Sequence, residues 1–352
     1  MINKLVLDSS KFFEKIGKAV IFHDFDLDGC CSAAIIARII KEKFNQFPKI
    51  VANYHHFGIF KKIEKEKNFD TLIFCDIPEL NEKKIDKIGK KKRVLIIDHH
   101  SPLHFKNATY CNPRTLKRNI YIPTTYLAYK IAKFLKIKVP AWIVVCGVLA
   151  DKGIKECKNV LKELKKENPE LINKIKFDEE FLFEKTKIGK VTKFLSNQTF
   201  YLFENSNLIA KKLAIEDSYE KILKDKKLKK IDKKVKNEVK SLLKEFKKKR
   251  IVCGKFIYFE IKTPIRIKSL IANLLSRKFK NKIIVIGQKF GRNLELSFRG
   301  SKQIKIDLNE FCEKASKIVP TFSGGGHEKA CGARMKYLKK EKLLEFLKNY
   351  RI

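Results

Sequence analysis

The stretch Arg93 to His100, RVLIIDHH, decides the fold that this sequence predicts. Its four consecutive apolar residues, Val94 to Ile97, are typical of a strand that is buried on both faces of a parallel sheet. One carboxylate and two imidazoles, Asp98, His99 and His100, follow where the strand ends. Ligands of open parallel α/β sheets bind beyond the carboxyl ends of the strands, so these side chains occupy the expected position of catalytic groups.

Three further apolar segments end in acidic residues. The segments are Lys18–Phe22, Thr71–Cys75 and Ala141–Ala150, and the carboxylates after them are Asp24, Asp26, Asp28, Asp76 and Asp151. Each aspartate alone could be an ordinary cap or turn residue, but carboxylates that converge without a cation repel one another. If the segment ends meet, they form a set of oxygen and nitrogen ligands without thiolate. Such a set suits a hard or borderline divalent ion such as Mn²⁺ or Mg²⁺.

Six short motifs follow one another along the chain. They are HDFDLDG (23–29), CDIPE (75–79), DHHSP (98–102), GVLADKG (147–153), SFRG (297–300) and SGGGHEKACGARM (323–335). This series resembles the DHH phosphoesterase family, and within it the RecJ-like single-strand nucleases. The resemblance covers residues 18–155 and roughly 250–340, and the middle of the chain does not share it. A single DHH tripeptide would be weak evidence, whereas six motifs in order are specific.

The resemblance implies a site that holds two divalent ions, Mn²⁺ or Mg²⁺. Its metal ligands would be Asp24, Asp26, Asp28, Asp76, His99 and Asp151. Asp76 and Asp28 are the candidates for bridging the ions. Asp98 would orient an imidazole, and His100 would contact the scissile phosphate or help to protonate the leaving oxygen. Some branches of the family carry a histidine where this sequence has Phe22, which favours the RecJ-like arrangement.

The same resemblance implies a substrate-binding domain of the DHH-associated type that closes over the metal site. The implied substrate contacts come from Arg299, Gly324, Gly325, Gly326, His327 and Asn112, with Arg334 as a further helper. An arginine suits bidentate recognition of phosphate. Three glycines in a row let a phosphate or base approach closely, and the histidine adds a donor beside them, although GGGH alone is equally consistent with a flexible loop. The asparagine, in a CNPR motif, would either contact substrate or cap a turn.

The charge balance points to a polyanionic partner. There are 79 lysine and arginine residues against 39 acidic residues, which gives a net charge of +40. A lysine-rich solvated surface is one explanation. The more specific explanation is that the partner is nucleic acid, because a positive electrostatic field attracts phosphates.

Within residues 211–250, apolar residues recur at helical spacing from Leu228 to Phe246. This stripe predicts a basic linker helix, which either only packs on the domains or also contacts nucleic acid.

We therefore predict an α/β protein of three parts. Residues 1–155 would form the catalytic DHH domain, a parallel sheet with flanking helices, and residues 156–250 a helical, lysine-rich insertion and connector. Residues 251–352 would form a smaller α/β domain that binds substrate. Strands that alternate with helices of this length favour parallel pairing through right-handed crossovers. In the last domain, one strand is expected over 251–261 and a loop over the glycine triplet.

Cysteine usage and hydropathy favour a cytoplasmic protein. The nine cysteines include no CxxC pair, which is typical of buried, reduced thiols. No leader segment is evident, and the longest apolar run, residues 141–150, is too short to span a membrane. Outside the implied site, a direct role for His23 is disfavoured, and surface or core positions explain His55, His56 and His104 most simply.

The functional hypothesis is a metal-dependent exonuclease that cleaves single-stranded DNA or RNA to mononucleotides. A second hypothesis within the same fold is hydrolysis of short oligonucleotides or cyclic dinucleotides, since no stretch resembles an additional OB-fold. A third is a replication-complex scaffold related to the degenerate DHH subunit of the replicative helicase. An intact set of metal ligands favours catalysis, although an active nuclease could still dock on replication or repair proteins.

Overall fold

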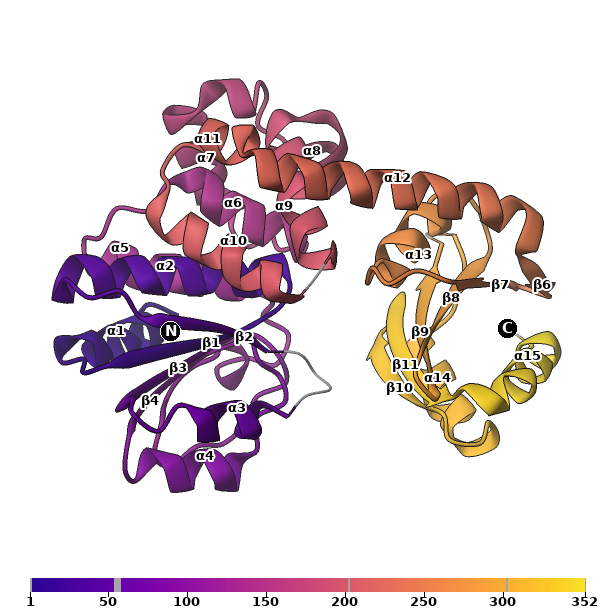
Figure 1. Cartoon of the computed structure of the whole chain (residues 1–352), viewed down its shortest axis with the longest axis horizontal. Helices are drawn as coiled ribbons and strands as arrows, with labels where there is room; N and C mark the ends of the chain where they lie inside the picture. Colours follow the sequence, from indigo (N-terminus) through magenta and orange to yellow (C-terminus); the bar gives the residue numbers. More distant parts are fainter. Residues whose placement is uncertain (1, 54–57, 202, 302, 352) are drawn as a thin grey trace. The chain divides into compact units, whose positions relative to one another are not determined.

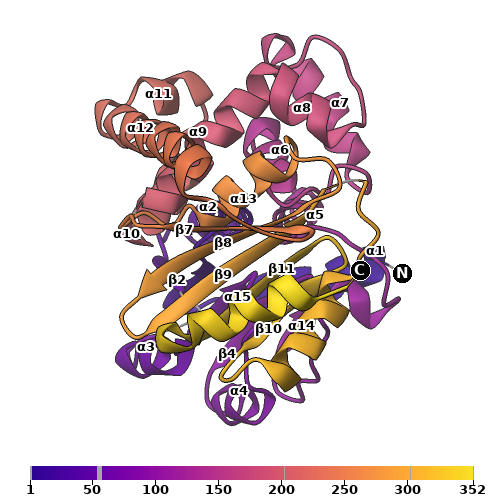
Figure 2. The same ribbon diagram turned by 90° about the vertical axis from the view of Figure 1, so that its right-hand side faces the viewer.

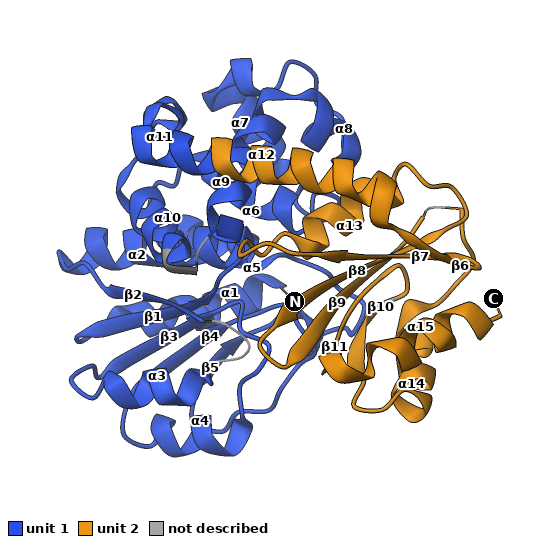
Figure 3. Ribbon diagram, turned by 45° about the vertical axis from the view of Figure 1, so that its right-hand side comes forward, with its two compact units in different colours: residues 1–232 blue, residues 233–352 orange. Residues whose placement is uncertain are grey.

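The computed structural model describes residues 2–53, 58–201, 203–301 and 303–351. The chain forms two compact units, Met1–Asp232 and Lys233–Ile352 (Figure 3). The expected middle segment, residues 156–250, is divided between them, and the boundary falls inside the long helix α12 (Lys226–Lys249). The helices before α12 belong to the first unit because their apolar faces, with Val160, Leu195 and Leu213, join its hydrophobic core.

The first unit is built on a five-stranded parallel sheet, which confirms the predicted fold class. Its strands are β1 (Ala19–Asp24), β2 (Lys49–Asn53), β3 (Thr71–Cys75), β4 (Arg93–Ile97) and β5 (Thr109–Cys111), in the order β2-β1-β3-β4-β5. His23 pairs with Cys75, and Cys75 pairs with Ile97, so the three central strands end at nearly the same level. The chain reaches β2 on one side of β1 and then β3 on the other, so the strand order reverses between β1 and β3. Ligands of open α/β sheets bind beyond the carboxyl ends of the strands at such a point.

Helices cover both faces of this sheet, as Figure 1 shows. One face packs against α1 (Ile2–Lys11), α2 (Leu27–Phe44) and α5 (Thr124–Phe134), and the other against α3 (Ile59–Lys65) and α4 (Glu82–Gly89). Within β1, Ala19 and Ile21 join the first core, whereas Val20 and Phe22 join the second. Burial on both faces explains why these strands read as uninterrupted apolar runs rather than alternating ones.

A layer of further helices packs outside α2. It comprises α6 (Ala141–Ala150), α7 (Lys158–Glu167), α8 (Glu179–Lys185), α9 (Lys187–Tyr201), α10 (Phe203–Ile215) and α11 (Tyr219–Lys224). The buried guanidinium of Arg38 on α2 donates to the Leu213 and Glu216 carbonyls, which satisfies free acceptors at the end of α10. The Ser206 hydroxyl donates to the Phe25 carbonyl at 2.6 Å. Helix α10 therefore holds the loop that follows β1.

The second unit contains a six-stranded mixed sheet (Figure 2). Its strands are β6 (Ile251–Cys253), β7 (Phe256–Ile261), β8 (Ile283–Phe290), β9 (Asn293–Gly300), β10 (Ser323–His327) and β11 (Ala330–Lys336), in the order β10-β11-β9-β8-β7-β6. Helices α14 (Leu308–Ile318) and α15 (Lys340–Asn349) cover one face, and α13 (Lys268–Ser276) contacts β8 and β9 from the other. The strand expected over 251–261 is interrupted, because Gly254 adopts a left-handed φ of 58° and turns the chain.

The glycine triplet lies in a strand, which corrects the expected loop. Gly324 pairs with Ala333, and a Cβ at Gly324 would lie 2.6 Å from the Cβ of Ala333. Gly326 has a φ of 154°, a conformation that favours glycine. Glycines have low strand propensity, but here their missing side chains permit the close pairing of β10 with β11.

The cysteines and the apolar stripe of α12 agree with two further sequence expectations. All nine thiols are buried and free. Helix α12 buries Leu228, Val235 and Leu242 along one face, as its apolar stripe predicted. None of the helices in the described ranges combines the length and apolar composition that a membrane crossing requires.

Candidate metal centre

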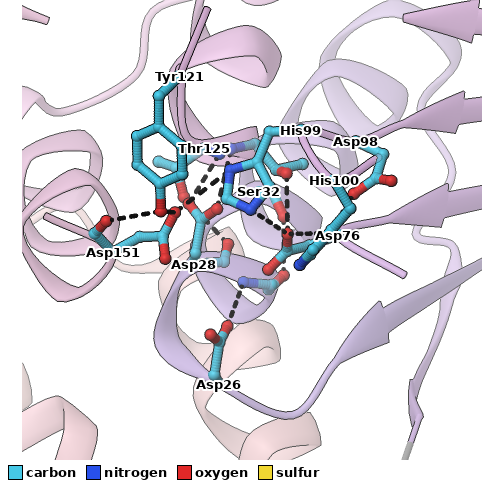
Figure 4. A network of polar contacts seen from close by, with 12 residues as sticks. Asp26, Asp28, Ser32, Asp76, Asp98, His99, His100, Tyr121, Thr125 and Asp151 are labelled. Atoms are coloured by element: carbon cyan, nitrogen blue, oxygen red, sulfur yellow. Dashed lines mark hydrogen bonds and ion pairs between the residues drawn. The ribbon is translucent and has the colours of Figure 1, made fainter. Parts of the chain in front are cut away.

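The carboxyl ends of β1, β3 and β4, together with the C-terminal end of α6, bring the predicted ligands together. Three overlapping groups each place their ligand atoms within 4.8 Å of one another: Asp24, Asp26 and Asp76; Asp76, His99 and His100; and Asp28, His99 and Asp151. All six predicted metal ligands occur in these groups, and all lie in the first unit. Asp76 and His99 each belong to two groups, so they form the centre of the cluster (Figure 4).

The acidic loop is shaped by the start of α2. Asp26 is the N-cap of this helix, and its side chain accepts a hydrogen bond from the Gly29 amide at 2.9 Å. A Cβ at Gly29 would collide with the backbone oxygen of Asp24. The glycine of the DLDG sequence is therefore required by the tight turn that brings Asp24, Asp26 and Asp28 close together.

Asp28 is fully buried and faces the first turn of α5. Its two carboxylate oxygens accept from the backbone amides of Thr124 at 2.8 Å and Thr125 at 2.9 Å. Free amides at a helix N-terminus stabilise negative charge. The sequence predicts a helix start at Thr124 but not its contact with the acidic loop, because that contact joins residues almost 100 positions apart.

Asp76 is held in an uncommon backbone conformation. Its φ is 64°, in the left-handed region, and the sheet fixes it there because its amide donates to the Ile97 carbonyl at 2.9 Å. The side chain is almost completely buried and accepts a hydrogen bond from the Thr124 hydroxyl at 3.0 Å. The strained turn after β3 thus directs this carboxylate into the middle of the cluster.

His99 lies between two carboxylates. Its Nε2 is 3.6 Å from Asp76 Oδ1, and its Nδ1 is 3.2 Å from Asp151 Oδ2. Among the described residues, buried Nδ1 has no hydrogen-bonding partner. The ring of Tyr121 lies 5.1 Å from the His99 ring, and the Tyr121 hydroxyl is 2.7 Å from Asp151 Oδ2. The sequence did not indicate this tyrosine, because YIPTT belongs to none of the six motifs.

His100 pairs with Asp98, the carboxylate that the family resemblance implies would orient an imidazole. Nδ1 of His100 and Oδ1 of Asp98 are 2.7 Å apart. Burial works against charge on both groups, but their mutual attraction and hydrogen bond outweigh it. The pKa of His100 is therefore raised and the pKa of Asp98 is lowered. His100 is the more exposed partner, with 38% of its side chain accessible. A protonated His100 can donate a hydrogen bond to an anion at the surface of the cluster.

The cluster is electrostatically unfavourable without a cation. Burial, together with the charge of Asp26, raises the pKa of Asp28 to about 7, and burial with the charges of Asp28 and Asp26 raises the pKa of Asp151 to about 9. The pKa of Asp76 rises well above its usual value for the same reasons. Burial lowers the pKa of His99 to about 3, so its ring is neutral. Buried carboxylates with a neutral imidazole fit a hard or borderline divalent ion.

The residues predicted to bind substrate occupy both units. In the second unit, Arg299 donates through Nε to Asn273 Oδ1 at 2.7 Å and through Nη1 to the Phe298 carbonyl at 2.8 Å. The three glycines are exposed, whereas the side chain of His327 lies outside the part that the structure describes. In the first unit, Asn112 is fully buried.

Asn112 has a clear structural role. Its side chain accepts from the Arg114 amide at 2.9 Å and caps the short helix η2 (Pro113–Thr115). Its amide nitrogen donates to the His100 carbonyl at 3.1 Å. The asparagine thus caps a turn, one of the two roles that the sequence suggested, and also supports the backbone of the DHH motif.

Two further histidines that the structure describes, His23 and His104, belong to none of the three ligand groups. His23 is fully buried; its Nδ1 is 2.6 Å from the backbone oxygen of Asp24, and burial lowers its pKa to about 4. His104 is exposed, as expected of a surface histidine. His55 and His56 lie outside the described residues.

Comparisons with known proteins give matches at two levels. The sequence matches the DHH family, N-terminal domain, over residues 18–155 and the DHHA1 domain over residues 254–351. A comparison with curated protein sequences returned no match. The fold is similar to that of exonuclease RecJ bound to manganese, with 12% identity, a TM-score of 0.65, and coverage of 99% of this chain and 95% of that one.

Two further solved structures extend this comparison. RecJ from Thermus thermophilus in complex with Mn²⁺ has 12% identity and a TM-score of 0.69, and the match covers 99% of this chain but 55% of that protein. CDC45 from Entamoeba histolytica has 10% identity and a TM-score of 0.61, with 98% of each chain covered. At identities this low, the structural matches establish a shared fold.

Metal-free protein should become less stable as the pH rises. Because the folded pKa values of Asp28 and Asp151 are about 7 and about 9, against 3.8 ordinarily, the folded chain retains protons that the unfolded chain has lost. The free energy of unfolding should therefore fall between about pH 5 and pH 9, by at most about 1.4 kcal/mol per pH unit for each group. Thermal denaturation of chelator-treated protein at several pH values measures this dependence.

The control for this prediction is Asp151→Asn, whose side chain cannot ionise. The variant should show a smaller loss of stability with rising pH than the natural chain, and both share the same background of basic residues. Equal slopes for the two proteins would contradict the assigned titration.

Proposed function

Because this chain belongs to the DHH phosphoesterase family, we propose that it is a metal-dependent exonuclease that releases mononucleotides from single-stranded nucleic acid. The observation that carries this proposal is the convergence of six candidate ligands, five from the chain that follows β1, β3 and β4 and one, Asp151, from the end of α6. The RecJ-like fold over nearly the whole chain supports it.

Two divalent ions, Mn²⁺ or Mg²⁺, would be held by Asp24, Asp26, Asp28, Asp76, His99 and Asp151. When bound, such ions activate a water molecule and stabilise the attacking and leaving oxygens of a phosphodiester. Of the chain's own groups, Asp76 would contact both ions, because it lies beside Asp24 and Asp26 and is also 3.6 Å from His99, a member of the group with Asp28 and Asp151. His100, whose ring is held by Asp98, would donate a hydrogen bond to the phosphate or a proton to the leaving oxygen.

The second unit offers a phosphate contact beside an open strip of backbone. Residues that pair across neighbouring strands share a face of the sheet, which places Ser297, Gly332 and Gly325 in one row beside Arg299. The nearest atom that an added Cβ would meet lies 3.9 Å away at Gly332 and 3.6 Å away at Gly325. The guanidinium of Arg299, oriented by Asn273, would bind phosphate while the strip accommodates the flat ring of a nucleoside.

The charge distribution favours a polymer as substrate. Helix α12 exposes lysines along its length, including Lys229, Lys233, Lys240 and Lys247, while its apolar stripe is turned inward. Lysines presented in a row suit the regularly spaced phosphates of a nucleic-acid strand. Short oligonucleotides or cyclic dinucleotides would need fewer of these contacts.

A scaffold is the competing function, since the fold is shared with CDC45 at 10% identity. The retained cluster of carboxylates and imidazoles argues against it. A scaffold would have no use for buried like charges that destabilise the metal-free protein.

Asp76→Asn should abolish metal-dependent digestion of end-labelled single-stranded DNA and RNA. The change removes a negative ligand oxygen from the centre of the cluster, and even residues that merely support a ligand contribute 10- to 100-fold, so a loss of more than about 100-fold is expected. The matched control is Asp8→Asn on the exposed side of α1, which should digest at the natural rate. Mononucleotide release from long strands supports the proposal. Cleavage confined to dinucleotides would move the function to short substrates, and metal binding without cleavage would favour the scaffold.

Arg299→Lys should raise KM for a single-stranded substrate by about 10-fold or more, with a smaller change in kcat. Lysine keeps the charge but loses the planar fork, and a hydrogen bond to a charged group contributes about 1.5–3 kcal/mol. Steady-state kinetics measure KM and kcat separately. The control is Arg292→Lys, in the exposed turn before β9. An unchanged KM would show that the side chain of Arg299 does not bind the substrate.

A further inference from the structure

One five-residue segment, Tyr121 to Thr125, contacts four of the six candidate ligands. The segment, YIPTT, leads into α5, and none of its residues belongs to a ligand group. Its contacts reach Asp28, Asp76, His99 and Asp151. These ligands come from separate parts of the chain, so the segment is a common support for them.

The two threonines contact the carboxylates of Asp28, in the HDFDLDG motif, and Asp76, in the CDIPE motif. The backbone amides of Thr124 and Thr125 each donate to one oxygen of Asp28, and the Thr125 hydroxyl donates to the Asp28 carbonyl at 3.0 Å. The Thr124 hydroxyl donates to Asp76 at 3.0 Å. Both threonines are completely buried. The first turn of α5 therefore fixes the spacing of Asp28 and Asp76.

Tyr121 holds the other end of the cluster. Its hydroxyl lies 2.7 Å from Asp151 Oδ2 and 2.9 Å from the Asp151 carbonyl oxygen. Its ring lies beside the ring of His99, with an interplanar angle of 32°. In Figure 4, Tyr121 and Asp151 lie on one side of the cluster, and the ring of His99 lies between them and Asp76. Tyr121 thus contacts two of the three members of the Asp28, His99 and Asp151 group, through two different parts of its side chain.

The hydroxyl of Tyr121 and its ring contact ligands that differ in how many groups they belong to. The hydroxyl contacts Asp151, which belongs to one of the three ligand groups, whereas the ring contacts His99, which belongs to two. Residues that orient ligands by hydrogen bonding contribute strongly to metal affinity, because an unsupported carboxylate must be ordered when the ion binds. Loss of the tyrosine hydroxyl should therefore affect one metal position and spare the other.

We propose that Tyr121 is a positioning residue for the metal position formed by Asp28, His99 and Asp151. It fixes the Asp151 carboxylate through its hydroxyl and limits rotation of the His99 ring through its own ring. This inference rests on the proposed metal site but not on the identity of the substrate.

The test is a Mn²⁺ titration of the chelator-treated full chain, with free Mn²⁺ followed by electron paramagnetic resonance. Tyr121→Phe keeps the ring and removes the hydroxyl, so one binding step should weaken by about 10- to 100-fold while the other keeps its affinity. Tyr126→Phe is the matched control, because Tyr126 is a half-buried tyrosine close by on α5 and contacts none of the ligands in the described structure. It should bind Mn²⁺ as the natural chain does.

The outcomes separate this inference from the proposed function. If the natural chain binds no Mn²⁺, the proposed metal site itself fails. If the natural chain binds two ions and Tyr121→Phe binds both with unchanged affinity, the positioning role is overturned.

Thermal denaturation with and without Mn²⁺ distinguishes positioning from simple stabilisation. A positioning role reduces the increase in Tm that saturating Mn²⁺ produces in the natural chain, because that increase reports binding to the folded state. A lower Tm for metal-free Tyr121→Phe with an unchanged increase on adding Mn²⁺ would show a merely structural role and overturn the inference.

Discussion

The repulsion among buried carboxylates at the ends of β1, β3 and β4 is the constraint on which the first unit depends. Asp28 and Asp76 are almost inaccessible to water, and burial together with the charges of Asp28 and Asp26 raises the pKa values of Asp76 and Asp151. Neutral hydrogen-bond donors relieve part of this cost, but they cannot cancel several negative charges. In the folded chain, either some of these carboxylates stay protonated or cations bind to them. Stability therefore depends on both pH and metal binding.

Secondary structure supplies most of the compensation that the chain itself provides. Asp26 caps α2, and Asp28 faces the first amides of α5, so two helix N-termini point toward the acidic loop. Parallel strands with crossover helices create this geometry repeatedly, because each strand ends where the next helix begins. The left-handed turn at Asp76 is the one strained element in this set, and its amide is tied to β4. The strain is tolerated because the sheet on both sides is buried.

The sequence predicted the parts of the site that lie directly after apolar strands, such as Asp76 and His99. Their positions follow from chain periodicity and from the rule that parallel strands end at one edge. Tyr121 was not predicted because its contact with Asp151 depends on where the start of α5 packs in the folded chain, and no local sequence pattern specifies that position. The glycine triplet was predicted as a loop for a related reason. Its intrinsic preference is against a strand, and only pairing with β11, a strand that the sequence did not reveal, overrides it.

The two adjacent histidines show how the same residue type acquires two chemical roles. His99 is deeply buried between Asp76 and Asp151, where burial lowers its pKa to about 3 and keeps the ring neutral, as a metal ligand must be. His100 is more exposed and is paired with Asp98, which raises its pKa and favours the protonated ring. A neutral ring suited to bind a metal ion and a ring that favours its proton thus stand side by side at the end of one strand. Different environments shift the pKa values of neighbouring groups in opposite directions. Within one site, this suits one group to bind a metal ion and the other to donate a proton.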